Sequence, residues 1–210
     1  MQPGSPTEPV RSKRNRPAQS FWTSAGARTL AATLLLARIP AVSLAAAQPP
    51  KPNEYDVKAA YLLNFGKFLR SSKPAPGRSS FEICSLGHDS IQSSLDALAD
   101  NTTINGLPVR LNHLQDISAA GSCAILFISA TESSHIREDL AILGNADILT
   151  VSDAPDFLEH GGMVQFLLVS SHVRFSINLD AVSKTHLVLS SELLRVASAV
   201  SGKSPAGGVR

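Results

Sequence analysis

Hydrophobic and polar residues first alternate with a helical period between Glu54 and Arg70, in the segment EYDVKAAYLLNFGKFLR. Its apolar residues recur every three or four positions and form one stripe on a helix, whereas Lys58 and the other basic residues lie mostly outside it. The stripe consists of Val57, Tyr61, Phe65 and Phe68, widened by Ala60, Leu63 and Leu69. Asn53 is the expected N-cap, with Asp56 three residues later. We expect the stripe to pack against a sheet; the alternatives are a membrane surface or a partner protein.

Beyond residue 80, short apolar runs alternate with amphipathic segments, a rhythm typical of strand–helix–strand units. The apolar runs predict strands in FEICSL (81–86), CAILFIS (123–129) and DILTVSD (147–153), and TTINGLPVRL (102–111) predicts an Asn-Gly turn and a short strand. Helices are predicted between them, over 91–100 and 133–144. CAILFIS begins with six consecutive apolar residues, as in strands that are covered on both faces. Alternation of this kind predicts a largely parallel sheet with helices on both faces.

The pattern changes after residue 162. The segment MVQFLLVSSHVRFSINL (163–179) contains two apolar runs around a Ser-Ser-His turn, which predicts a β-hairpin. SSELLRVASAV (190–200) predicts a closing helix, and residues 202–210 a disordered tail. The predicted fold is therefore a three-layer α/β domain over residues 54–201. It has a largely parallel sheet, helices on both faces and a C-terminal antiparallel hairpin at the edge.

Residues 1–47 have the composition of a leader. Basic residues come first, the apolar run TLAATLLLARIPAVSLAAA (29–47) follows, and Ala45 and Ala47 occupy the small positions of an A-x-A cleavage site. This order predicts a signal peptide cleaved between Ala47 and Gln48, a linker over 48–53 and a periplasmic protein. The alternative is a transmembrane anchor, against which Arg38 counts, since a central arginine costs about 2.5–3.5 kcal/mol on insertion.

Removal of the leader changes the charge of the protein. The 210-residue chain has 19 Lys and Arg against 17 Asp and Glu, a formal charge of +2. Residues 1–47 hold six of these basic residues and one of the acidic ones, so 13 basic and 16 acidic residues remain and the mature protein carries −3. A domain without a basic excess has little with which to neutralise phosphates, which argues against nucleic-acid binding.

Two cysteines, Cys84 and Cys123, lie in the predicted mature domain. They match no metal-binding motif, because they form no C-x-x-C pair and have no nearby pair of histidines. In an oxidising compartment such a pair can form a disulfide. The first and third strands of such a sheet are commonly neighbours, at a spacing of about 4.8 Å, and a disulfide spans Cα separations of about 4.4–6.8 Å. We expect the disulfide; the alternative is two buried free thiols.

The carboxyl ends of the predicted strands are the expected ligand-binding edge of the sheet. They read LGHDS (86–90), FISATES (127–133), VSDAP (151–155) and INLD (177–180). None contains a phosphate-binding glycine loop or a G-x-S-x-G elbow, so we expect no catalytic residue, metal or cofactor. The candidates for ligand or partner binding are His88, Arg174 and Asn178. His88 with Asp89 is also typical of a polar pair at a helix start, and Arg174 of an exposed strand position.

Several segments, taken in order, resemble the YfiR family of periplasmic proteins from about Tyr55 to Ala197. These segments are YDVKAAYLLNFGKF, FEICSLG, CAILFISATES, LTVSDAPDFLEHGGM, VRFSINLDAV and SSELLRVA. None of them is a catalytic motif, and the resemblance rests on their order and spacing. The chain departs from the family where relatives commonly end the first helix with Trp-Pro, because FLRSSKPAP stands there.

The resemblance implies a compact α/β domain, often dimeric, that regulates without catalysis. The family's namesake represses an inner-membrane diguanylate cyclase from the periplasmic side, and an outer-membrane lipoprotein relieves the repression. The resemblance therefore predicts an inner-membrane cyclase or sensor kinase as partner, with an outer-membrane lipoprotein and a second copy of the chain as further partners. It also implies that Cys84 and Cys123 form a redox-responsive disulfide. The alternatives are a periplasmic small-ligand binding protein and, less favoured, a secreted hydrolase.

Overall fold

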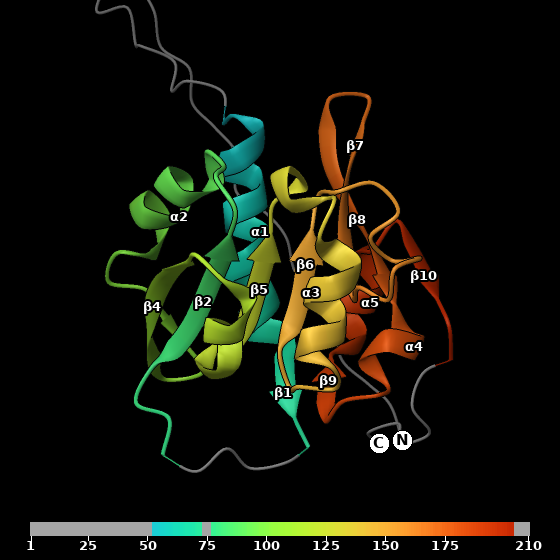
Figure 1. The fold of residues 1–210 in the computed structure, drawn as a ribbon. Coiled ribbons are helices and arrows are strands. Elements are labelled where there is room, and N and C mark those ends of the chain that lie inside the picture. Colours follow the sequence, from blue (N-terminus) through green and yellow to red (C-terminus); the bar gives the residue numbers. More distant parts are fainter. Residues whose placement is uncertain (1–51, 73–76, 204–210) are drawn as a thin grey trace, which may run out of the picture. The chain divides into compact units, whose positions relative to one another are not determined.

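The computed structural model describes residues 52–72 and 77–203 (Figure 1). The predicted signal peptide, its cleavage position between Ala47 and Gln48 and residues 204–210 of the predicted tail lie outside the described residues. In the described part of the chain, no helix combines the length and the apolar character needed to cross a membrane.

The described residues build one mixed eight-stranded sheet in the order β10-β8-β7-β6-β5-β2-β4-β3. The strands are β2 (Phe81–Leu86), β3 (Thr103–Ile104), β4 (Leu107–Leu114), β5 (Ile125–Ile128), β6 (Leu149–Ser152), β7 (Val164–Val169), β8 (His172–Asn178) and β10 (Ala199–Ser201). The five strands from β4 to β7 are parallel, whereas β8 is antiparallel to β7 and β3 to β4. The predicted α/β class, with a largely parallel sheet and a C-terminal antiparallel hairpin, is confirmed.

Helices cover both faces of this sheet, with α1 behind it and α3 in front of it in Figure 1. The helical segments are α1 (Glu54–Phe68), α2 (Ile91–Ala99), the 3₁₀ turns η1 (Ile117–Ser122) and η2 (Ala130–Glu132), α3 (Ile136–Leu143), α4 (Leu179–Val182) and α5 (Ser191–Val196). One apolar core contains side chains of α1, α2, α4 and α5, and a second contains side chains of η1 and α3. The three predicted layers follow from these two cores, because each buries one face of the sheet.

Helix α1 begins with the capping arrangement that the sequence predicts. Asn53 Oδ1 accepts a hydrogen bond from the Asp56 N–H at 2.9 Å, and Asp56 Oδ2 accepts one from the Asn53 N–H at 3.0 Å. Further along the helix, the Phe65 ring lies 5.0 Å from the Phe175 ring and 5.9 Å from the Phe166 ring, centroid to centroid. Phe65 therefore packs on β7 and β8, and the prediction that the helix packs against a sheet is confirmed, with ring pairs that add to the apolar burial. The most buried face of the helix also includes Ala59 and Leu62, which lie outside the predicted stripe.

Three local predictions are wrong. The first helix ends at Phe68, and Leu69–Ser71 forms β1, which pairs antiparallel with β9 (Leu187–Leu189). The closing helix ends at Val196, and β10 instead pairs in parallel with β8. In both places extended backbone gains inter-strand hydrogen bonds from a distant segment, a gain that local periodicity cannot reveal. Lys58, expected outside the apolar stripe, is only 4% exposed.

Candidate functional site

A polar cleft lies at the carboxyl ends of β2, β5 and β6, where the start of α1 approaches the sheet. Its volume is about 430 Å³, and it is lined by Tyr55, His88, Asp89, Ser90, Ser129, Ala130, Thr131 and Asp153. Three of the four predicted strand ends contribute to it, since the residues come from LGHDS, FISATES and VSDAP. The cleft is thus the expected edge for a ligand in a sheet of this topology.

Lys58 joins helix α1 to Asp153, one of the residues that line this cleft just after β6. Lys58 Nζ lies 2.6 Å from Asp153 Oδ2 and 2.6 Å from Glu54 Oε1. Burial on its own lowers the pKa of the Lys58 ammonium, but the hydrogen bonds to Asp153 and Glu54, with their negative charges, outweigh it and raise the pKa above its ordinary value. Lys58 is therefore a fixed positive charge with two anionic partners, and its Nζ also lies 5.3 Å from the Tyr55 ring centroid.

The remaining polar groups of the cleft bond mainly to one another. Asp153 Oδ1 accepts from the Ala130 N–H at 2.9 Å, which ties the end of β6 to the segment after β5. Ser129 Oγ donates to Asp89 Oδ2 at 3.1 Å and accepts from the Thr131 N–H at 3.2 Å. Asp89 Oδ1 in turn accepts from the Ile91 N–H at 3.2 Å. This network fixes the three strand ends relative to one another and to α1.

The cleft brings a serine, an aspartate and a histidine together without the geometry of a hydrolase. Within the described residues, the hydroxyl of Ser129 bonds to Asp89 and Thr131, and no histidine accepts its proton. His88 lies on the exposed rim, whereas Ser129 is 1% exposed. A nucleophilic serine needs a base within hydrogen-bond reach and an open approach for the substrate. This arrangement supplies neither.

The candidates for ligand or partner binding occupy three different places. His88 lines the cleft. Arg174 is exposed on β8, opposite Leu167 of β7. The Asn178 side chain donates to the Leu158 carbonyl at 3.1 Å and accepts from the Ala181 N–H at 3.2 Å, so it caps α4.

The expectation that residues 177–180 join the ligand-binding edge is wrong. Because β8 runs antiparallel to β7, its carboxyl end points toward the opposite edge of the sheet. Sequence reasoning also missed the role of Lys58. The sequence shows Glu54 as an ion-pair partner for Lys58, because it lies four residues earlier on the same helix. Nothing in the local pattern indicates Asp153, which lies 95 residues away.

The predicted disulfide is present, because Cys84 and Cys123 are bonded and their Cα atoms lie 5.8 Å apart. Its geometry differs from the expected link between two strands. Cys84 pairs in the sheet with Leu126 of β5, whereas Cys123 precedes that strand as the C-cap of η1. The bond therefore fastens η1 to the central strand β2, and both cysteines are 0% exposed in the second apolar core.

The fold and the cleft define a three-layer α/β domain whose strand-end edge is polar and internally hydrogen-bonded. The described residues contain no cluster of three or more His, Cys, Asp or Glu side chains that would hold a metal ion. A family described as YfiR/HmsC-like matches residues 55–198. The chain belongs to this family.

Solved structures and curated proteins are more distant from the chain. One solved structure is described as a conserved domain protein from Vibrio cholerae O1 biovar El Tor (10% identity, TM-score 0.48, covering 71% of this chain). Another is an ABC domain in complex with L-Trp from Streptococcus pneumoniae (13% identity, TM-score 0.48, covering 68% of this chain). The match spans 60% of each of those two chains. No curated protein matches the sequence.

Proposed function

We propose that this protein is a non-enzymatic periplasmic regulator that binds and restrains an inner-membrane signalling protein, a diguanylate cyclase or a related sensor kinase. Membership of the YfiR/HmsC-like family across residues 55–198 is the observation that carries the proposal. The match covers nearly all of the described fold, from the first residues of α1 to the end of α5. An outer-membrane lipoprotein that relieves the restraint and a second copy of the chain are the further partners of this proposal.

The chemistry of the cleft favours binding over catalysis. Ser129 is hydrogen-bonded to the Asp89 carboxylate, and the buried cation next to the cleft, Lys58, is neutralised by Glu54 and Asp153. A general acid or base is expected to have a pKa near the working pH. The pKa of Lys58 is instead raised, away from neutral pH, so the ammonium stays charged and does not exchange its proton as a general acid or base would. These features do not support the secreted hydrolase alternative.

Deletion of the gene tests the proposed restraint. We expect cyclic-di-GMP to rise if the partner is a cyclase, or the output of the neighbouring sensor to rise if it is a kinase, and the wild-type gene to restore the lower level. Unchanged cyclic-di-GMP together with unchanged output of every adjacent signalling protein would contradict the proposal.

Arg174 is a suitable position for separating partner binding from folding. Because its side chain is exposed, Arg174→Glu should leave the melting temperature nearly unchanged, while it reverses the charge offered to a partner. We expect this variant to complement the deletion less well than the wild type. Arg195→Glu, an exposed charge reversal on α5, is the matched control. Equal complementation by both variants would remove Arg174 from the proposed partner surface.

The proposed location is tested by the mature N-terminus. Export with cleavage between Ala47 and Gln48 removes Trp22, the one tryptophan of the chain. N-terminal sequencing of the periplasmic fraction should therefore begin at Gln48, and the protein should lack tryptophan fluorescence. Recovery of a tryptophan-containing protein in the membrane fraction would support the anchor alternative instead.

A further inference from the structure

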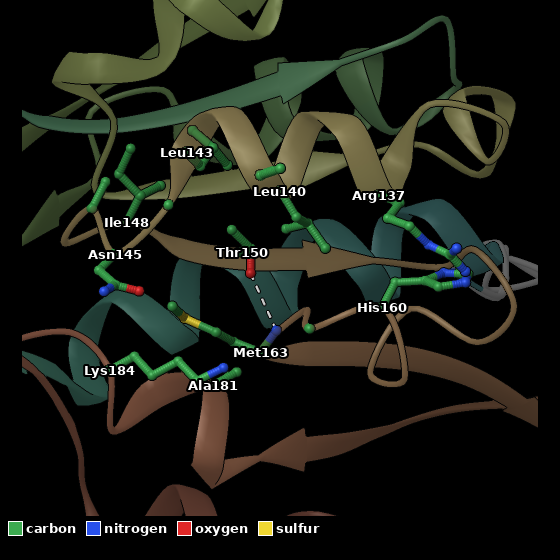
Figure 2. A pocket seen from close by; sticks show the side chains of 14 residues that line it. Arg137, Leu140, Leu143, Asn145, Ile148, Thr150, His160, Met163, Ala181 and Lys184 are labelled. Carbon is green, nitrogen blue, oxygen red and sulfur yellow. Dashed lines mark hydrogen bonds between the residues drawn. The ribbon is translucent and has the colours of Figure 1, made fainter.

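A second pocket, separate from the polar cleft, lies along α3, beside the start of β6 and the segment before β7 (Figure 2). Its volume is about 370 Å³, within the range of small-molecule sites. The lining is mixed, and its apolar part includes Leu140, Ile148 and Met163. The Met163 N–H donates to Thr150 Oγ1 at 3.2 Å, so this backbone group needs no hydrogen bond from a ligand.

The charged residues that line this pocket are all basic. They are Arg137 on α3 and Lys184 after α4, while His160 contributes an imidazole from the segment before β7, and the lining includes no aspartate or glutamate. Neither Arg137 nor Lys184 has an ion-pair partner among residues 52–72 and 77–203. Figure 2 shows Arg137 and His160 extending toward the same end of the pocket, with Lys184 near the other end. The domain carries a net negative charge outside its leader, so an all-basic pocket is a local exception.

His160, at the Arg137 end of the pocket, has a polar atom that the fold leaves unpaired. Its Nδ1 atom is buried and has no hydrogen-bond partner, a condition found for no other buried side-chain nitrogen or oxygen of the described residues. Buried polar atoms nearly always have a partner, and an unpaired one in a native protein calls for an explanation. An anionic group at the Arg137 end of the pocket would supply a counter-charge for the guanidinium, and a turn of the His160 ring would bring its buried nitrogen to the same group.

We propose that this pocket binds a small organic carboxylate, whose charged group lies between Arg137 and His160 and whose apolar body packs on Leu140, Ile148 and Met163. The guanidinium offers two parallel donors that match a carboxylate, and Lys184 adds positive potential at the other end. The apolar floor selects a ligand with a hydrocarbon or aromatic body over a bare inorganic anion. This site goes beyond the proposed regulation and requires no partner protein.

Binding of three simple probes to the purified protein tests the site. Benzoate supplies the anion and the apolar body, benzylamine supplies a similar body with the opposite charge, and inorganic phosphate supplies an anion without a body. We expect benzoate to shift the NMR amide resonances of the pocket residues, and benzylamine and phosphate to bind more weakly. No benzoate-induced shift at these residues, or equal affinity for benzylamine, would overturn the proposal. Equal affinity for phosphate would overturn the part that concerns the apolar body.

Variants connect the binding to the named side chains. Arg137→Gln should weaken benzoate about tenfold, the loss expected for a charge-assisted hydrogen bond, whereas Arg195→Gln on α5 removes an exposed charge outside the pocket and should change nothing. Ala141→Trp should fill the pocket from an exposed position on α3 and block binding without unfolding the protein. Unchanged benzoate affinity in both Arg137→Gln and Ala141→Trp would place the binding elsewhere and overturn the assignment. Because the readout is binding alone, its result is independent of whether deletion raises cyclic-di-GMP.

Discussion

Lys58 Nζ lies 2.6 Å from Asp153 Oδ2, so a buried ion pair fastens the first helix to the carboxyl end of β6. The Lys58 residue is 4% exposed and the Asp153 side chain 14%. Removing one partner of such a pair is costly, because it leaves the other charge buried and uncompensated. The pair is therefore a sensitive point for the attachment of α1 to the sheet.

Asp153→Asn should lower the free energy of unfolding by about 3 kcal/mol, at the lower end of the range for breaking a buried ion pair, because Glu54 remains as a partner of Lys58. The asparagine oxygen can still accept from the Ala130 N–H, so the change removes charge more than shape. Denaturant unfolding measures the effect. The double variant Lys58→Met/Asp153→Asn should lose less than the sum of the single variants. Lys67→Met, at an exposed lysine of the same helix, is the control. If it lowered the free energy of unfolding as much as Asp153→Asn does, the effect could not be attributed to the Lys58–Asp153 ion pair.

The raised pKa of Lys58 predicts a dependence of stability on alkaline pH. The folded protein holds the Lys58 proton more tightly than the unfolded chain, so this contribution is complete below the ordinary lysine value of 10.5. It is lost as the pH rises from 10.5 through the higher pKa of the folded state. Wild type should therefore lose more stability than Lys58→Met between pH 10 and pH 12. An equal loss of the free energy of unfolding in the two proteins between pH 10 and pH 12 would contradict the prediction.

Reduction of the Cys84–Cys123 bond should destabilise the protein. The cysteines are 39 residues apart, and closing a loop of that length contributes about 4 kcal/mol in the chain-entropy account. Because both residues are 0% exposed, a reductant should act slowly until denaturant opens the domain. Thermal melts with and without reductant measure the loss, and mass spectrometry after alkylation reports the two thiols. Rapid reduction of the native protein would indicate that the bond is more accessible than its burial implies.

Gly162→Ala should destabilise the protein by about 1–3 kcal/mol, the usual cost of overpacking a core. A methyl group there would collide with the ring of Phe157, which is 0% exposed and cannot move aside cheaply. Gly121→Ala on η1 is the matched control, because a methyl group at that position meets nothing within 4 Å. Melting temperatures of the two variants test the prediction. If Gly162→Ala were as stable as the control, the prediction would be wrong, and the Phe157 ring would have to move aside at little cost.

The sequence by itself determined the type and order of most elements. The capping pair Asn53–Asp56, the aromatic stripe of α1 and the strand–helix alternation depend on residues close together in the chain, and this local information was enough for the α/β class. The cysteine pairing is also predicted, because the chain has two cysteines, but the position of Cys123 at the end of η1 rather than in a strand is not. The YfiR-family resemblance rested likewise on the order of short segments.

The tertiary structure decided which charges and strands meet. Asp153 reaches Lys58 across 95 residues, and His160 comes to the same pocket as Arg137 and Lys184 only because the fold brings α3, the segment before β7 and the residues after α4 to one cavity. The strands β1 and β10 likewise exist because distant segments supply their hydrogen-bond partners. Periodicity records which face of an element is apolar, but not which other element covers it. Burial of Lys58 and the basic character of the second pocket therefore became visible only in the folded chain.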